Sequence, residues 1–251
     1  MKLNYVVEGN GETLVFIHGL SDNLLYWEVL ATTLKKDFRV VRFDLRGHGQ
    51  SPLGDGEITI DTYVNDLKDI LDELNIKKAN LIGFSLGGAV ALDFAVRYPD
   101  YVSSIVLMST FSKCDDYVVD MFNQFKDALE RGFEAFYDFM VPKVLCPVVI
   151  ESNREELELF KQYASQTANV DAFKKAVDAC CNFSVDDELS QINVPVLVLC
   201  GKYDEIFPMY IHRNLSSKIK NSKLVVLDNS RHNLLVGENN IKIIDALNEF
   251  F

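Results

Sequence analysis

Short, continuous apolar runs alternate along the chain with longer stretches in which apolar residues recur every three or four positions. The runs occupy positions 13–17, 39–43, 80–83, 102–108, 194–200 and 223–227. Because they are continuous rather than alternately apolar and polar, they predict strands covered on both faces, as in a parallel sheet. The first seven residues alternate between apolar and polar, as a strand does.

Helical spacing appears between these runs. Residues 61–74 carry apolar side chains at three-to-four spacing, with Asp61 as the expected N-cap. Residues 86–98 form a second expected helix, which ends before Pro99, and residues 241–251 close the chain with another. Repeated strand–helix units predict an α/β protein with a doubly wound, mostly parallel sheet of seven to eight strands.

One region, residues 111–188, departs from this alternation. Its period is helical, and aromatic and aliphatic side chains share one helical face: Val118, Met121, Phe122, Phe125, Leu129, Phe133, Phe136, Tyr137 and Met140. We therefore expect a sheet domain in two parts, 1–110 and 189–251, with a helical cap at 111–188. The alternative is that these helices flank the sheet in the ordinary way.

The candidate chemistry begins at Gly83-Phe84-Ser85-Leu86-Gly87, between an expected strand and an expected helix. A strand, a Gly-x-Ser-x-Gly turn and a helix form a nucleophile elbow, which projects the serine side chain from the end of the sheet. The glycines are required because a Cβ would crowd the turn. Ser85 is thus the predicted nucleophile.

A serine nucleophile requires a base, and the base requires an acid to orient it. His232 follows the apolar run 223–227, and Asp204 follows the run 194–200, so both are expected at the sheet edge where Ser85 lies. The order Ser85, Asp204, His232 is the one expected for this fold. The alternatives are weaker: His212 is expected on a helix surface in solvent, and Glu205 is one position out of register.

The backbone N–H groups of Leu20 and Leu86 are the expected oxyanion donors. Leu20 ends the segment Phe16-Ile17-His18-Gly19-Leu20 after another strand, and Leu86 follows the nucleophile. His18 is then expected to hold the turn through hydrogen bonds rather than to act as a second base.

These segments together resemble the α/β-hydrolase superfamily. The matching pieces are the turn at residues 18–20, the loop Asp44-Leu45-Arg46-Gly47-His48-Gly49-Gln50-Ser51, the elbow, and the segments around Asp204 and His232. Within the superfamily the chain is most similar to small carboxylesterases and to the enol-lactonase group. The resemblance implies a structural role for the 44–51 loop, including His48. Ser85 separates the chain from epoxide hydrolases and dehalogenases, which have aspartate at the elbow.

Composition narrows the expected partners. The net charge is −12, and residues 111–188 hold sixteen acidic against eight basic residues. This charge argues against nucleic acid and anionic membranes as partners. No apolar segment is long enough to span a membrane, and the start of the chain lacks a signal-peptide core, so a cytoplasmic protein is expected. The five cysteines are expected to be free thiols. We expect a monomer or a weak homodimer.

The predicted activity is hydrolysis of neutral, short-to-medium or aromatic carboxylic esters through an acyl-enzyme, with no metal or organic cofactor. Phe122, Phe125, Phe136 and Tyr137 are the candidate pocket residues, although aromatic residues at helical spacing more often form the core of such a cap. Enol-lactone or carbon–carbon bond hydrolysis on the same triad remains open, as does a slow-turnover binding or signalling module.

Overall fold

The computed structural model describes residues 1–251 and has a seven-stranded sheet at its centre. The strand order is β1–β3–β2–β4–β5–β6–β7. The strands are β1 (Tyr5–Glu8), β2 (Thr13–Ile17), β3 (Arg39–Phe43), β4 (Ala79–Phe84), β5 (Val102–Met108), β6 (Val196–Gly201) and β7 (Ser222–Leu227). Only β1 pairs antiparallel; every other neighbouring pair is parallel. This confirms the predicted doubly wound sheet.

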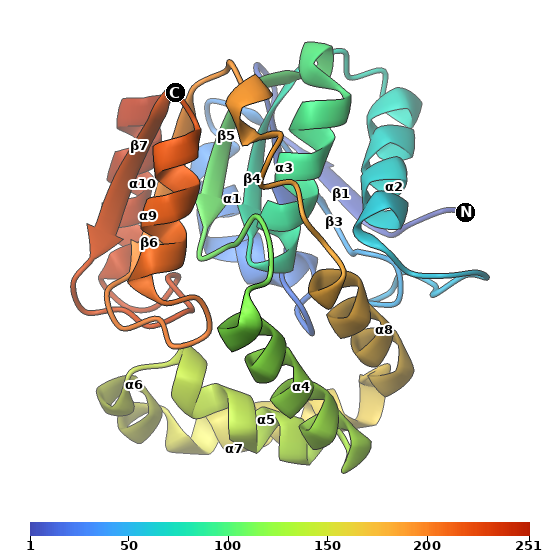
Figure 1. Cartoon of the computed structure of the whole chain (residues 1–251), viewed down its shortest axis with the longest axis vertical. Helices are drawn as coiled ribbons and strands as arrows, with labels where there is room; N and C mark the ends of the chain where they lie inside the picture. Colours follow the sequence, from blue (N-terminus) through green and yellow to red (C-terminus); the bar gives the residue numbers. More distant parts are fainter.

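Helices cover both faces of the sheet (Figure 1). The helices α1 (Glu28–Leu34) and α10 (Asn239–Phe250) pack on one face, and α2 (Ile60–Glu73), α3 (Leu86–Arg97) and α9 (Met209–Lys218) pack on the other. Strand β2 shows why the strands are continuously apolar. Leu14 and Phe16 belong to the hydrophobic cluster of one face, and Val15 and Ile17 belong to that of the opposite face. Successive side chains of a strand point to opposite faces, so both sets must be apolar.

Five helices lie between β5 and β6 and cover one end of the sheet, below it in Figure 1. They are α4 (Asp116–Glu130), α5 (Phe133–Val144), α6 (Pro147–Ser152), α7 (Arg154–Thr167) and α8 (Val170–Cys181). We refer to residues 111–188 as the cap. Its expected helical face is buried: Val118, Met121, Phe122, Phe125 and Leu129 of α4 all have less than a tenth of their surface exposed.

Short 3-10 turns complete the chain at Leu24–Trp27, Pro99–Tyr101 and Leu189–Gln191. All five cysteines are free thiols, and Cys180 and Cys200 are buried. None of the helices combines the length and the apolar character that crossing a lipid bilayer would need.

The start of α2 corrects one sequence prediction. Asp61 lies inside the first turn, and the N-cap is Thr59, whose hydroxyl accepts a hydrogen bond from the Thr62 N–H. The Thr62 hydroxyl in turn accepts from the Thr59 N–H. This reciprocal capping box satisfies two backbone donors, whereas an Asp61 cap would leave them unpaired.

Candidate active site

Ser85 lies at the sharp turn between β4 and α3. Its backbone has φ 52° and ψ −117°, a conformation that a non-glycine residue adopts rarely. Hydrogen bonds hold the turn: the Ser85 N–H donates to Met108 O at 2.9 Å, and the Thr110 hydroxyl donates to Ser85 O at 2.6 Å. The surrounding structure therefore fixes a strained residue at the end of the sheet, which is common at functional sites.

The glycines on either side of Ser85 are required by close backbone contacts. A Cβ on Gly87 would lie 2.1 Å from Ile17 O, and one on Gly83 would lie 2.4 Å from Gly87 O. Real Cβ atoms do not approach so closely, so α3 could not begin against β2 with any other residue at position 87. The steric reason expected for these glycines is therefore present in the structure.

His232 and Asp204 form a hydrogen-bonded pair in the loops after β7 and β6. The His232 Nδ1 lies 2.9 Å from Asp204 Oδ2. The other carboxylate oxygen, Oδ1, accepts hydrogen bonds from the N–H groups of Ile206 and Phe207 at 2.9 and 3.0 Å. Both side chains of the pair are buried. The carboxylate thus has a fixed orientation, and it orients the imidazole in turn.

His212 corrects a second sequence prediction. We expected it in solvent on a helix surface; it lies on α9, but its side chain is fully buried and its Nε2 is 3.6 Å from Asp204 Oδ2. Burial disfavours the ionised form of Asp204, but His232 and His212 outweigh it and hold the pKa of that carboxyl well below its usual range. Asp204 is therefore a carboxylate flanked by two imidazoles.

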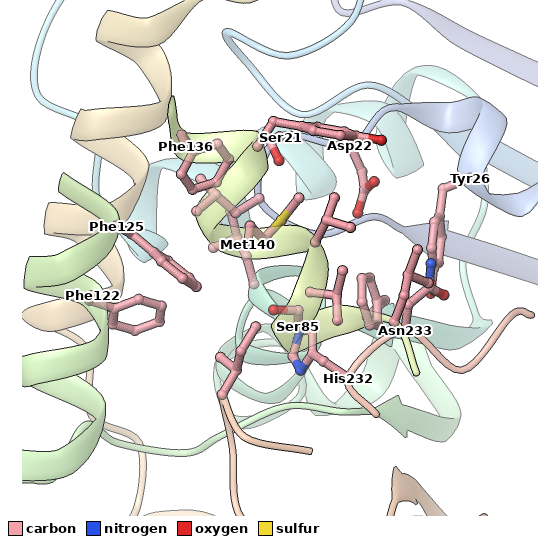
Figure 2. Close-up of a pocket in the computed structure, with 18 of the residues that line it drawn as sticks. Ser21, Asp22, Tyr26, Ser85, Phe122, Phe125, Phe136, Met140, His232 and Asn233 are labelled. Atoms are coloured by element: carbon pink, nitrogen blue, oxygen red, sulfur yellow. The ribbon is translucent and has the colours of Figure 1, made fainter. Parts of the chain in front are cut away.

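Ser85 and His232 line the same pocket and lie next to each other in Figure 2. No hydrogen bond joins the Ser85 hydroxyl to His232 in this structure, whereas the opposite side of the imidazole is engaged by Asp204. Catalytic hydrogen bonds in proteins without bound substrate are often long and tighten when substrate binds. The structure thus brings the three predicted residues to one edge of the sheet with one of the two expected links formed.

The Leu20 turn borders the same pocket. The N–H of Leu20 forms no hydrogen bond within the chain, and Leu86 is the first residue of α3, where a helix leaves its N–H groups without helical acceptors. His18 holds the turn. Its Nε2 accepts from the Leu45 N–H at 2.9 Å, so its Nδ1 donates to Gly19 O at 2.8 Å. Burial lowers the pKa of His18 to about 4, so the ring is neutral and structural.

The pocket is a cavity of about 210 Å³ beneath the cap, and most of its walls are apolar. All four predicted pocket residues line it: Phe122, Phe125, Phe136 and Tyr137. The sequence interpretation missed further wall residues from α5, α7 and the loop after β7, among them Met140, Val144, Leu157, Phe160 and Asn233. A contact of any of these side chains with substrate remains a prediction.

Two polar residues of the pocket, Asp22 and Tyr26, also escaped the sequence interpretation. Both lie within six positions of Leu20, the expected oxyanion donor. This closeness in sequence was the one feature from which a place in the pocket could have been predicted. His48, by contrast, is buried in the 44–51 loop, bonds to Arg46 O, and does not line the pocket. No group of three or more histidine, cysteine, aspartate or glutamate side chains is arranged to hold a metal ion.

Comparison with known proteins places this arrangement in a family. Residues 12–144 match the model of the alpha/beta hydrolase fold family, which is more than half of the chain. The chain therefore belongs to that family and is an α/β hydrolase.

Similar proteins carry several hydrolase names. A protein of Rhizobium rhizogenes, provisionally named carbamate hydrolase RutD, is 29% identical over 91% of this chain and 88% of its own length. The 3-oxoadipate enol-lactonase 2 of Acinetobacter baylyi is 26% identical over 92% and 86%. Among solved structures, the enol-lactonase of Burkholderia xenovorans LB400 superimposes with a TM-score of 0.90 at 25% identity, over 99% of this chain and 95% of that one. A thermophilic esterase from Thermogutta terrifontis has a TM-score of 0.86 at 24% identity, over 98% and 92%.

Proposed function

We propose that this protein is a serine hydrolase that cleaves neutral carboxylic esters through an acyl-enzyme formed on Ser85. The observation that carries the proposal is the buried His232–Asp204 pair, with Nδ1 2.9 Å from Oδ2, whose imidazole lines the same apolar pocket as the strained Ser85. A nucleophile, a base and an orienting acid on the carboxyl ends of three parallel strands form the constellation that acyl transfer needs.

In the proposed mechanism, His232 takes the Ser85 proton as the hydroxyl attacks the ester carbonyl. Asp204 keeps the imidazole in the tautomer with a proton on Nδ1, so that Nε2 is the base, and stabilises the imidazolium that forms. The N–H groups of Leu20 and Leu86 receive the oxyanion, a stabilisation of roughly 3 kcal/mol for one such donor. His232 then protonates the leaving alkoxide, and a water molecule repeats the sequence to release the acid.

The shape of the pocket supports short-to-medium or aromatic esters. Its walls are mostly aromatic and aliphatic side chains, which favour an apolar acyl or alkyl group. The acidic cap disfavours anionic substrates by repulsion.

A second candidate is hydrolysis of enol-lactones or carbamates with the same residues. It is favoured by the names of the similar proteins from Acinetobacter baylyi and Rhizobium rhizogenes. Both reactions pass through attack on a carbonyl carbon, so the same nucleophile, base and oxyanion donors serve them. Parallel assays with neutral esters, lactones and carbamates would rank the three substrate classes.

The first test is the substitution Ser85→Ala, assayed with p-nitrophenyl acetate and butyrate. We expect turnover to fall by at least 10³-fold, because removal of the nucleophile of such a triad costs roughly 10⁶-fold in kcat. The matched control is Ser109→Ala. Ser109 directly follows β5 and does not line the pocket, and its buried hydroxyl has no hydrogen-bond partner, so its removal breaks no hydrogen bond. Activity in Ser85→Ala equal to that of the control would refute the assignment.

A further inference from the structure

The pocket contains one acidic side chain that the proposed mechanism does not use. Asp22 lies in the turn after Leu20, is the only aspartate or glutamate among the residues lining the pocket, and is partly buried. Its carboxylate takes part in none of the side-chain hydrogen bonds or ion pairs of the chain. Burial raises the pKa of this carboxyl to about 7. A partly buried carboxylate without a partner is unfavourable unless something neutralises it.

Asp22 is adjacent to the expected oxyanion site. Its Oδ2 lies 3.2 Å from the point that a Cβ on Gly19 would occupy, and its N–H donates to Gly19 O at 3.3 Å. Figure 2 shows its side chain among the pocket residues, between Ser21 and Tyr26. An ionised carboxylate at this position would oppose the negative charge that develops on a carbonyl oxygen nearby. A positive charge placed beside Asp22 would remove that opposition.

No group of the protein supplies that positive charge. The residues lining the pocket include no lysine or arginine, and the Nδ1 of the single histidine, His232, is engaged by Asp204. The Tyr26 hydroxyl donates to Asn233 Oδ1 at 3.2 Å rather than to Asp22. The positive partner therefore has to arrive with the ligand.

The surroundings of the pocket favour a cationic ligand. The cap, which forms the far wall of the pocket, holds twice as many acidic as basic residues, so its field attracts cations toward the entrance. Aromatic side chains such as Phe125, Phe136 and Phe160 line the same cavity, and aromatic faces attract cationic groups.

We propose that Asp22 anchors a cationic group of the substrate, so that the preferred esters carry a protonated amine or a quaternary ammonium within reach of the oxyanion turn. This inference rests on the proposed esterase function and extends its substrates from neutral esters to cationic esters, which it makes the preferred class. Asp22 is in this sense a specificity-determining residue: neutral esters still react, but a cation gains an additional ion pair in a poorly hydrated site.

Binding measurements test the proposal without requiring turnover. Calorimetry at pH 8 would compare n-hexylammonium, n-hexyltrimethylammonium and 1-hexanol on the wild type and on Asp22→Asn. We expect the two cations to bind the wild type at least tenfold more tightly than the alcohol, and to lose that advantage in Asp22→Asn. The control is Asp100→Asn, which removes the same charge from an exposed position at the far end of α3 and should leave the preference unchanged.

Turnover of a matched ester pair gives the second measurement. Butyrylcholine and 3,3-dimethylbutyl butyrate have similar shapes and differ in charge. We expect Asp22→Asn to lower kcat/KM for the first at least tenfold relative to the second, whose hydrolysis should not fall, because the variant removes a carboxylate that opposes the oxyanion. Equal cation and alcohol affinities in the wild type would overturn the proposal, as would a preference that survives Asp22→Asn. Selective loss of hexanol binding in the variant would also overturn it, because Asp22 would then bind a hydroxyl donor.

The two proposals fail separately. Persistent ester hydrolysis in Ser85→Ala would end the assignment of the nucleophile, yet an Asp22-dependent cation preference in the binding assay would stand. Loss of hydrolysis in Ser85→Ala together with no cation preference would leave the esterase and remove only the role of Asp22.

Discussion

At the scale of single residues, Asp204 is the most constrained side chain of the candidate site. It accepts two backbone hydrogen bonds on Oδ1 and lies against His232 and His212 on Oδ2. Such an environment stabilises the carboxylate and no other form. The charge of Asp204, rather than its hydrogen bond alone, is then what the imidazolium of the proposed mechanism requires.

The substitution Asp204→Asn should preserve the size of the side chain while removing the charge and disturbing the tautomer of His232. We expect kcat on p-nitrophenyl butyrate to fall by about 10³- to 10⁴-fold, with little change in KM because the apolar pocket is untouched. Steady-state kinetics checks this expectation. Asp228→Asn is the control, because Asp228 follows β7 as an exposed residue paired with Lys202. A loss below tenfold would show that Asp204 does not orient the base.

His212 shows where interpretation at the residue scale fell short. Its neighbours on α9, Ile211 and Leu215, are buried, so position 212 adjoins the buried face of the helix. That spacing was visible in the sequence. A histidine on a helix is nevertheless compatible with solvent or with the core, and only the tertiary contact with Asp204 decides between them.

At the scale of elements, the sequence predicted the strands better than the helix ends. Three strands have the expected bounds, β2, β3 and β5, because a strand covered on both faces is apolar at most of its positions. Helix starts depend on a single hydrogen bond, and both Thr59 and Asp61 are residue types that cap helices. The choice between them rests on the reciprocal bond with Thr62, which the sequence pattern does not specify uniquely.

The capping box of α2 yields a stability prediction. Thr59→Ala removes the hydroxyl that accepts from the Thr62 N–H, so the free energy of unfolding should fall by about 1 kcal/mol. Thr59→Ser keeps that hydroxyl and should lose only a few tenths of this amount. Urea denaturation of the two variants beside the wild type makes the comparison. Equal stability of Thr59→Ala and the wild type would contradict the assignment of Thr59 as the N-cap.

The cap shows a second limit of prediction from sequence, which concerns how its helices form the pocket. Its aromatic face is predictable from spacing, and Phe122, Phe125 and Phe136 are indeed buried. The same side chains line the pocket. The sequence analysis had treated cap core and pocket wall as alternatives, whereas these residues serve as both. The helix α7 contributes Leu157 and Phe160 to the pocket but buries none of its own residues. Which helix completes a cavity depends on how elements distant in sequence pack together. The spacing of apolar residues within one helix does not determine that packing.

At the scale of the whole molecule, buried titratable groups oppose one another in setting the dependence of stability on pH. Burial lowers the pKa of His18 to about 4 and that of His48 to about 3, so both stay neutral in the folded protein. Below about pH 6.5 the unfolded chain binds protons at these histidines while the folded protein does not. The free energy of unfolding therefore decreases as the pH falls from about 6.5 toward 4. Each contributes about 2 kcal/mol of this loss at pH 5.

Asp22 acts in the opposite direction. Its pKa is raised to about 7 in the folded protein, so the folded state binds more protons than the unfolded state between pH 4 and 7, and acidification stabilises it. Between pH 7.5 and pH 5 this gain is about 2 to 3 kcal/mol. In the wild type it offsets part of the loss that the two histidines cause.

Without the Asp22 carboxylate, acidification should therefore destabilise the protein more than it destabilises the wild type. Asp22→Asn is expected to be more stable than the wild type at pH 7.5, because the folded protein no longer holds a desolvated carboxylate, and the difference should shrink by about 2 to 3 kcal/mol at pH 5. Urea denaturation of both proteins at the two pH values measures it. Asp100→Asn, which removes an exposed carboxylate, should follow the wild type at both. A stability difference independent of pH would mean that Asp22 is ionised and hydrated in the folded protein, in which case the pocket has no unsatisfied charge for a cationic substrate to neutralise.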